Sequence, residues 1–292
     1  MTTILFIGLG RMGRPMVGHI AEQFHTLCHD ISTEAIEIVE QETRAQGLYD
    51  LQEAQGIDTV ILMLPTSEHV EQILVHNKLL EKLHAGSLII DMGSSIPAST
   101  KQLAQQAMKH KIDYVDAPVS GGISKADSGE LTMLVGGSDE AIERAQPYLQ
   151  AVGSTIVTVG SSGTGHAAKA INNLVSATNI AVASEAIVRA QSAGISPERM
   201  IEVLNASTGM SQATKVKFPN HILPGNYASN FAYDLMLKDI GIAMEIEVPK
   251  EASRISQAVV EILKTGREYL GDSPDHTEIT RIYEQLSNQS IN

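Results

Sequence analysis

The sequence from residue 3 to residue 13 is TILFIGLGRMG, in which five strand-forming residues lead directly into a Gly-x-Gly-x-x-Gly turn. A helical pattern follows at 15–20, so the turn joins a strand to a helix. In such a turn the first glycine allows the bend, the second lets a pyrophosphate approach the backbone, and the third allows close helix packing, with the phosphates on the helix N-terminus. The predicted phosphate cradle consists of Gly8, Leu9, Gly10, Arg11, Met12 and Gly13.

An acidic residue follows where a ribose-binding group is expected. The next strand-like run, 26–29, leads into Asp30, which is 20 positions after Gly10. A carboxylate there accepts hydrogen bonds from ribose hydroxyls and repels a 2′-phosphate, and residues 31–34 contain no arginine or lysine to bind one. The sequence therefore favours NAD over NADP. The alternative role for Asp30 is capping of a turn or helix.

Short β-rich runs alternate with helical segments up to about residue 160, as expected for βαβ units and a mostly parallel sheet. The runs lie at 3–7, 26–29, 59–64, 87–91, 114–116, 131–135 and 156–159. The turns after two of them, 64–66 and 91–95, face the cofactor if ligands bind at the carboxyl ends of the strands. Leu64, Pro65 and Ser95 are therefore candidate cofactor contacts, with ordinary loops as the alternative.

The pattern becomes helical after residue 160. No proline or glycine occurs from 166 until Gly194, which predicts one helix of about 29 residues, roughly 43 Å long. An N-cap at Ser196 before Pro197 begins another helix, and 234–247 predicts a further one. We expect a Rossmann-type, doubly wound α/β domain at 1–162 and an all-α substrate and oligomerisation domain at 163–292. The long helix, about 166–194, would link them, with the active site in the cleft between the domains.

Composition argues against several classes of protein. A chain of 292 residues with 43% hydrophobic residues can form two cores, and its formal net charge of −13 disfavours a nucleic-acid partner. The single cysteine, Cys28, permits no disulfide framework or Cys-x-x-Cys metal motif, and we expect no metal. The sequence contains no uncharged apolar run long enough to predict a transmembrane helix. A predicted strand begins almost at Met1, which leaves no room for a signal peptide. We therefore expect a cytoplasmic protein that binds no membrane.

Two further glycine-rich segments carry candidate reactive groups. Ser120, Gly121 and Gly122 can offer backbone N–H groups to a carboxylate, although a tight turn explains the glycines equally well. Lys169 and Asn173 are four residues apart at the start of the long helix, so they project from one face. Burying an ammonium among small and apolar residues is costly unless it is paired or functional. This favours a role for Lys169 in proton transfer over that of a solvated lysine.

These motifs together resemble the β-hydroxyacid dehydrogenase family, which includes 3-hydroxyisobutyrate dehydrogenase and tartronate semialdehyde reductase. The resemblance covers essentially the whole chain and rests on the segments 6–13, 116–122, 163–173 and 237–239. It implies an NAD(P)-dependent oxidoreductase that interconverts a small β-hydroxy acid and its semialdehyde. Lys169 would be the general acid/base, which protonates the forming alkoxide in reduction. Asn173 would orient the substrate and Lys169.

The resemblance also implies roles for other residues. Ser120, Gly121 and Gly122 would hold the substrate carboxylate, Lys238 would close the site over cofactor and substrate, and Ser95 would contact the nicotinamide side of the cofactor. Family precedent implies a homodimer or homotetramer joined through the helical domains.

Two segments leave the substrate open. Lys125 stands where the family usually has small residues, and it could add a cation for a longer or doubly charged substrate, as in succinic semialdehyde reductases. The alternative is a solvated loop lysine. Residues 207–217, a region that shapes the substrate pocket, match no one subfamily closely.

Tartronate, succinic semialdehyde and glyoxylate reductases are alternatives, whereas imine reductases usually lack the lysine found at 169. The alternative of another class is a catalytically silent cofactor-binding scaffold, against which Lys169 and Asn173 together argue.

Overall fold

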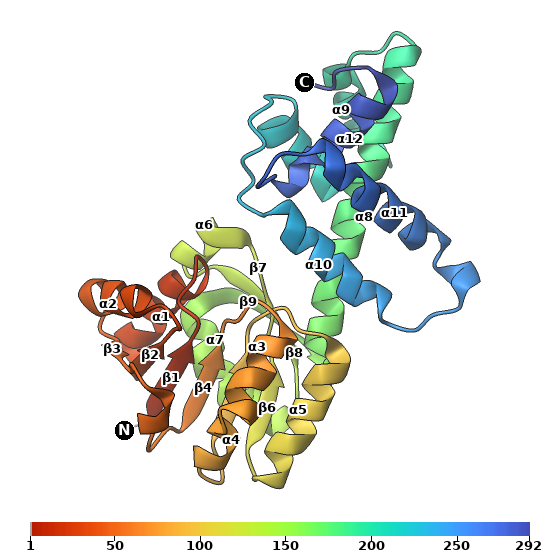
Figure 1. The fold of residues 1–292 in the computed structure, drawn as a ribbon. Helices are drawn as coiled ribbons and strands as arrows, with labels where there is room; N and C mark the ends of the chain where they lie inside the picture. The colour runs from red at the N-terminus through yellow and green to blue at the C-terminus, as the bar shows by residue number, and fades with distance from the viewer. Residues whose placement is uncertain (1) are drawn as a thin grey trace. The chain divides into compact units, whose positions relative to one another are not determined.

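The computed structural model describes residues 2–292. The chain divides into two compact units at the peptide bond between Lys169 and Ala170. The first unit is built on a sheet and the second is helical (Figure 1).

The sheet of the first unit has nine strands within the described residues. Its order along one path is β3 (Gln46–Gly47), β2 (His25–His29), β1 (Thr3–Ile7), β4 (Thr59–Leu62), β5 (Leu88–Asp91), β6 (Asp113–Asp116), β8 (Leu131–Gly136) and β7 (Val119–Ser120). β9 (Gly153–Gly160) pairs with β8 in parallel, whereas β8 is antiparallel to β6 and β7. The strand order reverses between β1 and β4, and in open α/β sheets ligands bind at the carboxyl ends of the strands at such a point.

Side chains of β1 alternate between two apolar clusters, one on each face of the sheet. Ile4 and Phe6 join the cluster covered by α1 (Gly13–Gln23), α2 (Thr33–Glu42) and α7 (Asp139–Val152). Leu5 and Ile7 join the cluster covered by α3 (Ser67–Glu71), α4 (Leu79–Lys82) and α5 (Pro97–Lys109). A strand that is buried on both faces requires a continuous apolar run, which explains why β1 was recognisable in the sequence. The predicted doubly wound α/β fold is confirmed.

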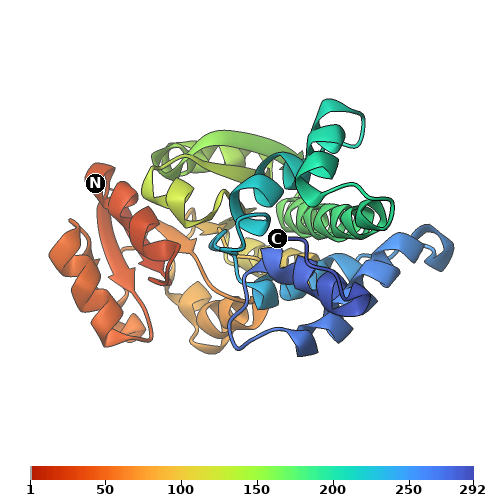
Figure 2. The ribbon, with the colours of Figure 1, turned by 90° about the horizontal axis from the view of Figure 1, so that it is seen from above.

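The long predicted helix is α8 (Thr164–Ser192). Its later turns contribute small and aliphatic side chains to the core of the second unit, among them Ala177, Ile180 and Ala181. The other helices of this unit contribute to the same core and lie beside α8 (Figure 2). They are α9 (Pro197–Ala206), a π-helical segment (Ala213–Ile222), α10 (Tyr233–Met244), α11 (Arg254–Gly266) and α12 (Ile279–Ser287). No helix within residues 2–292 is long and apolar enough to cross a membrane.

Several predicted boundaries need correction. The strand expected at 59–64 ends at Leu62, the one expected at 156–159 begins at Gly153, and the helix expected at 234–247 ends at Met244. That helix ends early because the N–H groups of Glu245 and Ile246 donate to carbonyls three residues back, which closes its last turn. The strands β3 and β7 were not predicted, because two residues show no periodicity.

The second unit contains a buried histidine that should make its stability depend on pH. His276 is 2% exposed, and its Nδ1 lies 2.9 Å from Ser229 Oγ and 3.2 Å from the Phe231 carbonyl. Burial, followed by the charge of Lys217, lowers the pKa of His276 from 6.5 to about 4. The unfolded chain therefore binds more protons than the folded chain between these pH values, and stability falls as pH falls through that window.

As the pH falls from 6.5 to 4, we expect protonation of His276 in the unfolded chain to lower the free energy of unfolding by up to about 3 kcal/mol. Urea unfolding of the wild type and of His276→Gln, followed across the window, measures the difference. The variant should show a flatter dependence on pH. If the free energy of unfolding depended on pH in the same way in both proteins, groups other than His276 would cause the acid sensitivity.

Candidate active site

The three glycines of the predicted phosphate cradle differ in what a side chain would meet. Gly8 has a φ of +102°, and a Cβ there would lie 2.3 Å from the Met63 carbonyl oxygen. A Cβ at Gly13 would lie 1.8 Å from the Gly8 carbonyl oxygen. At Gly10 a Cβ would meet nothing within 4 Å. The fold itself therefore requires the first and third glycines, whereas the second leaves open space above the backbone. This arrangement fits the pyrophosphate of a dinucleotide.

Asp30 is held beside this turn. Its Oδ2 accepts a hydrogen bond of 2.7 Å from the Leu9 N–H, and its Oδ1 accepts one of 2.9 Å from the Ser32 N–H. Each carboxylate oxygen can accept a further bond, and the side chain is only partly buried. Asp30 thus caps the turn, as the alternative interpretation expected, and its carboxylate can still accept hydrogen bonds from ribose hydroxyls.

The turns after β4 and β5 lie next to the cradle. A Cβ on Gly8 would be 3.2 Å from Leu64 Cδ2, and a Cβ on Gly93 would be 2.6 Å from the Leu64 carbonyl oxygen. Ser95 is 2% exposed, and its hydroxyl donates to Asp91 Oδ2 at 3.0 Å. That hydroxyl is engaged inside the protein, so the expected contact of Ser95 with the cofactor stays a prediction. The same holds for Pro65.

The Ser120-Gly121-Gly122 segment leaves β7 and enters α6 (Gly122–Asp127). Gly121 has a φ of +139° and Gly122 one of +73°, values that favour glycine. A Cβ on Gly121 would lie 2.6 Å from Lys125 Cδ, so the aliphatic stem of Lys125 passes directly over this glycine. Gly121 and Gly122 therefore present only backbone, with the stem of a lysine beside them.

Lys169 is on the second turn of α8 and is partly buried. Asn173, one helical turn later, is 5% exposed. In the second unit, Asn173 Nδ2 donates to Asp239 Oδ2 at 2.6 Å, and Lys238 Nζ lies 3.3 Å from Asp239 Oδ1. Asp239 thus links two predicted site residues. It was missed as a functional residue, although its place directly after Lys238 in the 237–239 motif was a usable signal.

Sequence reasoning also missed a buried cluster in the first unit. Asp91 and Asp116 end neighbouring strands in register, and both are 0% exposed. His166, on the first turn of α8, is 1% exposed and lies 3.8 Å from each carboxylate. Burial raises the pKa of Asp116, and the nearby His166 opposes this shift. Acidic residues at the ends of buried strands were the available signal.

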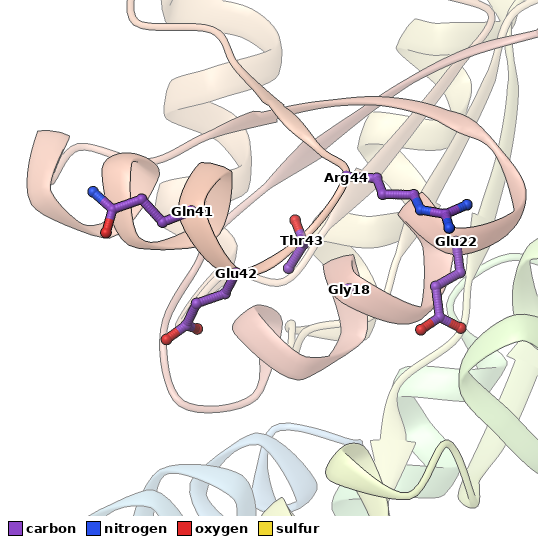
Figure 3. A pocket seen from close by; sticks show the side chains of 6 residues that line it. All are labelled: Gly18, Glu22, Gln41, Glu42, Thr43 and Arg44. Atoms are coloured by element: carbon purple, nitrogen blue, oxygen red, sulfur yellow. The ribbon is translucent and has the colours of Figure 1, made fainter.

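A surface groove in the first unit contains none of the predicted site residues. It lies between α1 and the end of α2 (Figure 3). Its lining consists of Gly18, Glu22, Gln41, Glu42, Thr43 and Arg44. The groove therefore has no part in the site described above.

Comparisons with known proteins agree with this geometry. Residues 3–160 match the family described as the NAD binding domain of 6-phosphogluconate dehydrogenase. Residues 163–283 match the family described as NAD-binding of NADP-dependent 3-hydroxyisobutyrate dehydrogenase.

Individual relatives cover most of the chain. The 2-(hydroxymethyl)glutarate dehydrogenase of Eubacterium barkeri is 34% identical, over 98% of this chain and 96% of the relative. The mitochondrial 3-hydroxyisobutyrate dehydrogenase of Homo sapiens is 34% identical, over 84% of this chain and 75% of the relative. The structure of 3-hydroxyisobutyrate dehydrogenase from Mycobacterium tuberculosis with L-serine superposes with a TM-score of 0.88, at 26% identity, and covers 98% of this chain and 99% of that one. The chain therefore belongs to the β-hydroxyacid dehydrogenase family of NAD-dependent oxidoreductases.

Proposed function

We propose that this enzyme interconverts a small β-hydroxy acid and its semialdehyde in the manner of 3-hydroxyisobutyrate dehydrogenase, with Lys169 as the general acid/base. The observation that supports this most is the placement of Lys169 on the second turn of α8. The preceding turn is bound by buried Asp116, and buried Asn173 follows one turn later. A side chain that carries a transferable proton thus follows directly on a helix start that is hydrogen-bonded to a buried acid.

When bound, the nicotinamide supplies hydride to the aldehyde carbon or accepts it from the alcohol carbon. In reduction the ammonium of Lys169 donates its proton to the oxygen that becomes the hydroxyl, and in oxidation the neutral amine takes that proton back. Asn173, whose amide is oriented by Asp239, would hold the substrate and Lys169 in place. The proton donor and its orienting group would therefore act as a unit.

Other residues complete the proposed site. The Gly8–Gly13 turn and Asp30 would hold the dinucleotide, with NAD preferred because the carboxylate of Asp30 repels a 2′-phosphate. Ser120 and the N–H groups of Gly121 and Gly122 would bind the substrate carboxylate. Lys238 would close the site. A homodimer or homotetramer and a cytoplasmic location complete the proposal.

A second candidate is a substrate with two carboxylates. The stem of Lys125 passes over Gly121 and the residue is exposed, so its ammonium would be within reach of the proposed carboxylate site. The substrate in the name of the Eubacterium barkeri relative, 2-(hydroxymethyl)glutarate, is a dicarboxylate. Lys125 would bind the second carboxylate of such a compound.

Steady-state reduction of a substrate panel distinguishes the two candidates. The panel is methylmalonate, tartronate and succinic semialdehydes with one carboxylate, and 2-formylglutarate with two, each tested with NADH and NADPH. We expect turnover with NADH. If the dianion is the substrate, Lys125→Gln should lower kcat/KM for 2-formylglutarate by about tenfold or more and change the others little, because one charged hydrogen bond is lost. An equal effect on all four would rule out Lys125 as the second anion site. Cofactor binding without any turnover would favour the silent scaffold.

A further inference from the structure

The carboxylate of Asp116 binds two backbone N–H groups at the start of α8, one just before the helix and one in its first turn. Its Oδ1 accepts a 2.7 Å hydrogen bond from the Gly163 N–H, and its Oδ2 accepts a 3.0 Å bond from the His166 N–H. N–H groups at a helix start have no partner within the helix, and a negative charge there is favourable. The end of β6 therefore anchors the start of the helix that carries Lys169.

Two glycines make room for this carboxylate. A Cβ on Gly136 would lie 2.8 Å from Asp116 Oδ1, and a Cβ on Gly165 would lie 2.9 Å from Asp116 Oδ2. The Cβ on Gly165 would also lie 2.3 Å from the Leu134 carbonyl oxygen. Any larger residue at 165 would push the helix away from the acid.

The neighbouring acid anchors a different segment. Asp91 Oδ1 accepts a 3.0 Å hydrogen bond from the Gly93 N–H. Asp91 Oδ2 accepts bonds from the Ser95 hydroxyl at 3.0 Å and the Tyr114 hydroxyl at 3.2 Å. Asp91 thus fixes the turn after β5, the turn that faces the proposed cofactor site.

The imidazole of His166 lies between the two anchors. Its Nε2 is 3.8 Å from Asp91 Oδ2, and its Nδ1 is 3.8 Å from Asp116 Oδ2. The Thr100 hydroxyl is hydrogen-bonded to Nδ1 at 2.8 Å and lies 3.2 Å from the Ile96 carbonyl oxygen. The imidazole therefore lies within 4 Å of both buried carboxylates, where it bridges the two anchored segments.

We propose that Asp91, His166 and Asp116 form a positioning network, which fixes the first turns of α8, and with them Lys169, relative to the turn at 93–95. Lys169 follows His166 by three residues, which is about 4.5 Å along the helix. A displacement of about 1 Å at a reacting group can cost about 100-fold in rate. The proposal rests on the proposed role of Lys169, and its test separates the two.

Asp116→Asn is the main variant. The asparagine keeps the size of the side chain but turns an NH₂ group towards one of the two helix N–H groups. We expect hydrogen exchange of the amides at 163–169 to accelerate about tenfold or more and kcat to fall about 10- to 100-fold. The dissociation constant of NADH should change by less than about threefold. The isotope effect on kcat, measured with NADH deuterated at the transferred position, should rise because the chemical step becomes slower.

Two further variants sharpen the test. Asp113→Asn, on the same strand, alters a partly exposed acid that pairs with Arg144 and should change none of these quantities. Gly165→Ala keeps every charge but displaces the helix, so it should reproduce the pattern of Asp116→Asn. If either core variant fails to fold, Thr100→Val removes only the hydroxyl bonded to His166, and a smaller change with the same pattern is expected.

The outcomes separate a positioning role from a purely structural one. Faster exchange at 163–169 with unchanged kcat and isotope effect would overturn the proposal. A loss of kcat that matches the loss of folded protein, with an unchanged isotope effect, would also overturn it. If Lys169→Ala retained turnover, the acid/base assignment would fail, whereas the exchange data would still report whether Asp116 anchors α8.

Discussion

Replacement of Lys169 by alanine is expected to lower kcat for semialdehyde reduction by about 10²- to 10⁴-fold. The variant lacks the ammonium that donates a proton as charge develops on the carbonyl oxygen, while the glycine turn and Asp30 are untouched. The dissociation constant of NADH should therefore stay within a few-fold of the wild-type value. In the oxidation direction, the limb of the pH profile that reports the neutral amine should disappear with the side chain.

A control lysine and chemical rescue make this test specific. The stem of Lys101 lies beside Gly163, with its Cγ 3.1 Å from where a Cβ would be. Lys101→Ala thus removes a cation at the same end of α8, and we expect kcat to remain within about threefold of wild type because no proton donor is lost. Ethylamine should restore part of the activity of Lys169→Ala, because it supplies an ammonium of similar chemistry. Turnover that survives the mutation would show that another group protonates the substrate.

The features predicted correctly from the sequence are local ones. The glycine turn is contained in residues 8–13, and the buried parallel strands are short apolar runs that need no partner to be recognised. The long helix follows from a stretch without proline or glycine. Each of these signals lies within one segment of the chain, so periodicity and composition are sufficient to detect it.

The supporting contacts of the site are tertiary and could not be predicted. Asn173 and its partner Asp239 are 66 positions apart, and Asp116 reaches an N–H group 50 positions away. The local sequence around Asp116 indicated only the start of a turn. Whether an acid is buried depends on residues that are distant in the sequence and close in the fold. Ser95 is a further example. The resemblance implies that Ser95 contacts the cofactor, which stays a prediction, but it gave no sign of the bond between the Ser95 hydroxyl and buried Asp91.

Gly10→Val is expected to weaken NADH binding by about 100-fold or more, because a branched side chain would occupy the space through which a pyrophosphate approaches the backbone. The three glycines of the turn are not equivalent in this respect. A Cβ at Gly8 or Gly13 would collide with backbone at 2.3 Å or 1.8 Å, so those variants damage the fold itself. At Gly10 a Cβ meets nothing within 4 Å, so any loss at this position reports the ligand.

Titration of NADH fluorescence and thermal unfolding, each measured for Gly10→Val and Gly13→Ala, test this distinction. Gly10→Val should unfold within about 1–2 °C of the wild type, since an exposed substitution changes stability by roughly 0.5 kcal/mol or less. Gly13→Ala should lose both stability and binding. Addition of NADH should raise the melting temperature of the wild type and not that of Gly10→Val, because a ligand stabilises only a folded state that it binds. If Gly10→Val bound NADH normally, the phosphates would lie elsewhere, and the assignment of the turn as the phosphate cradle would be wrong.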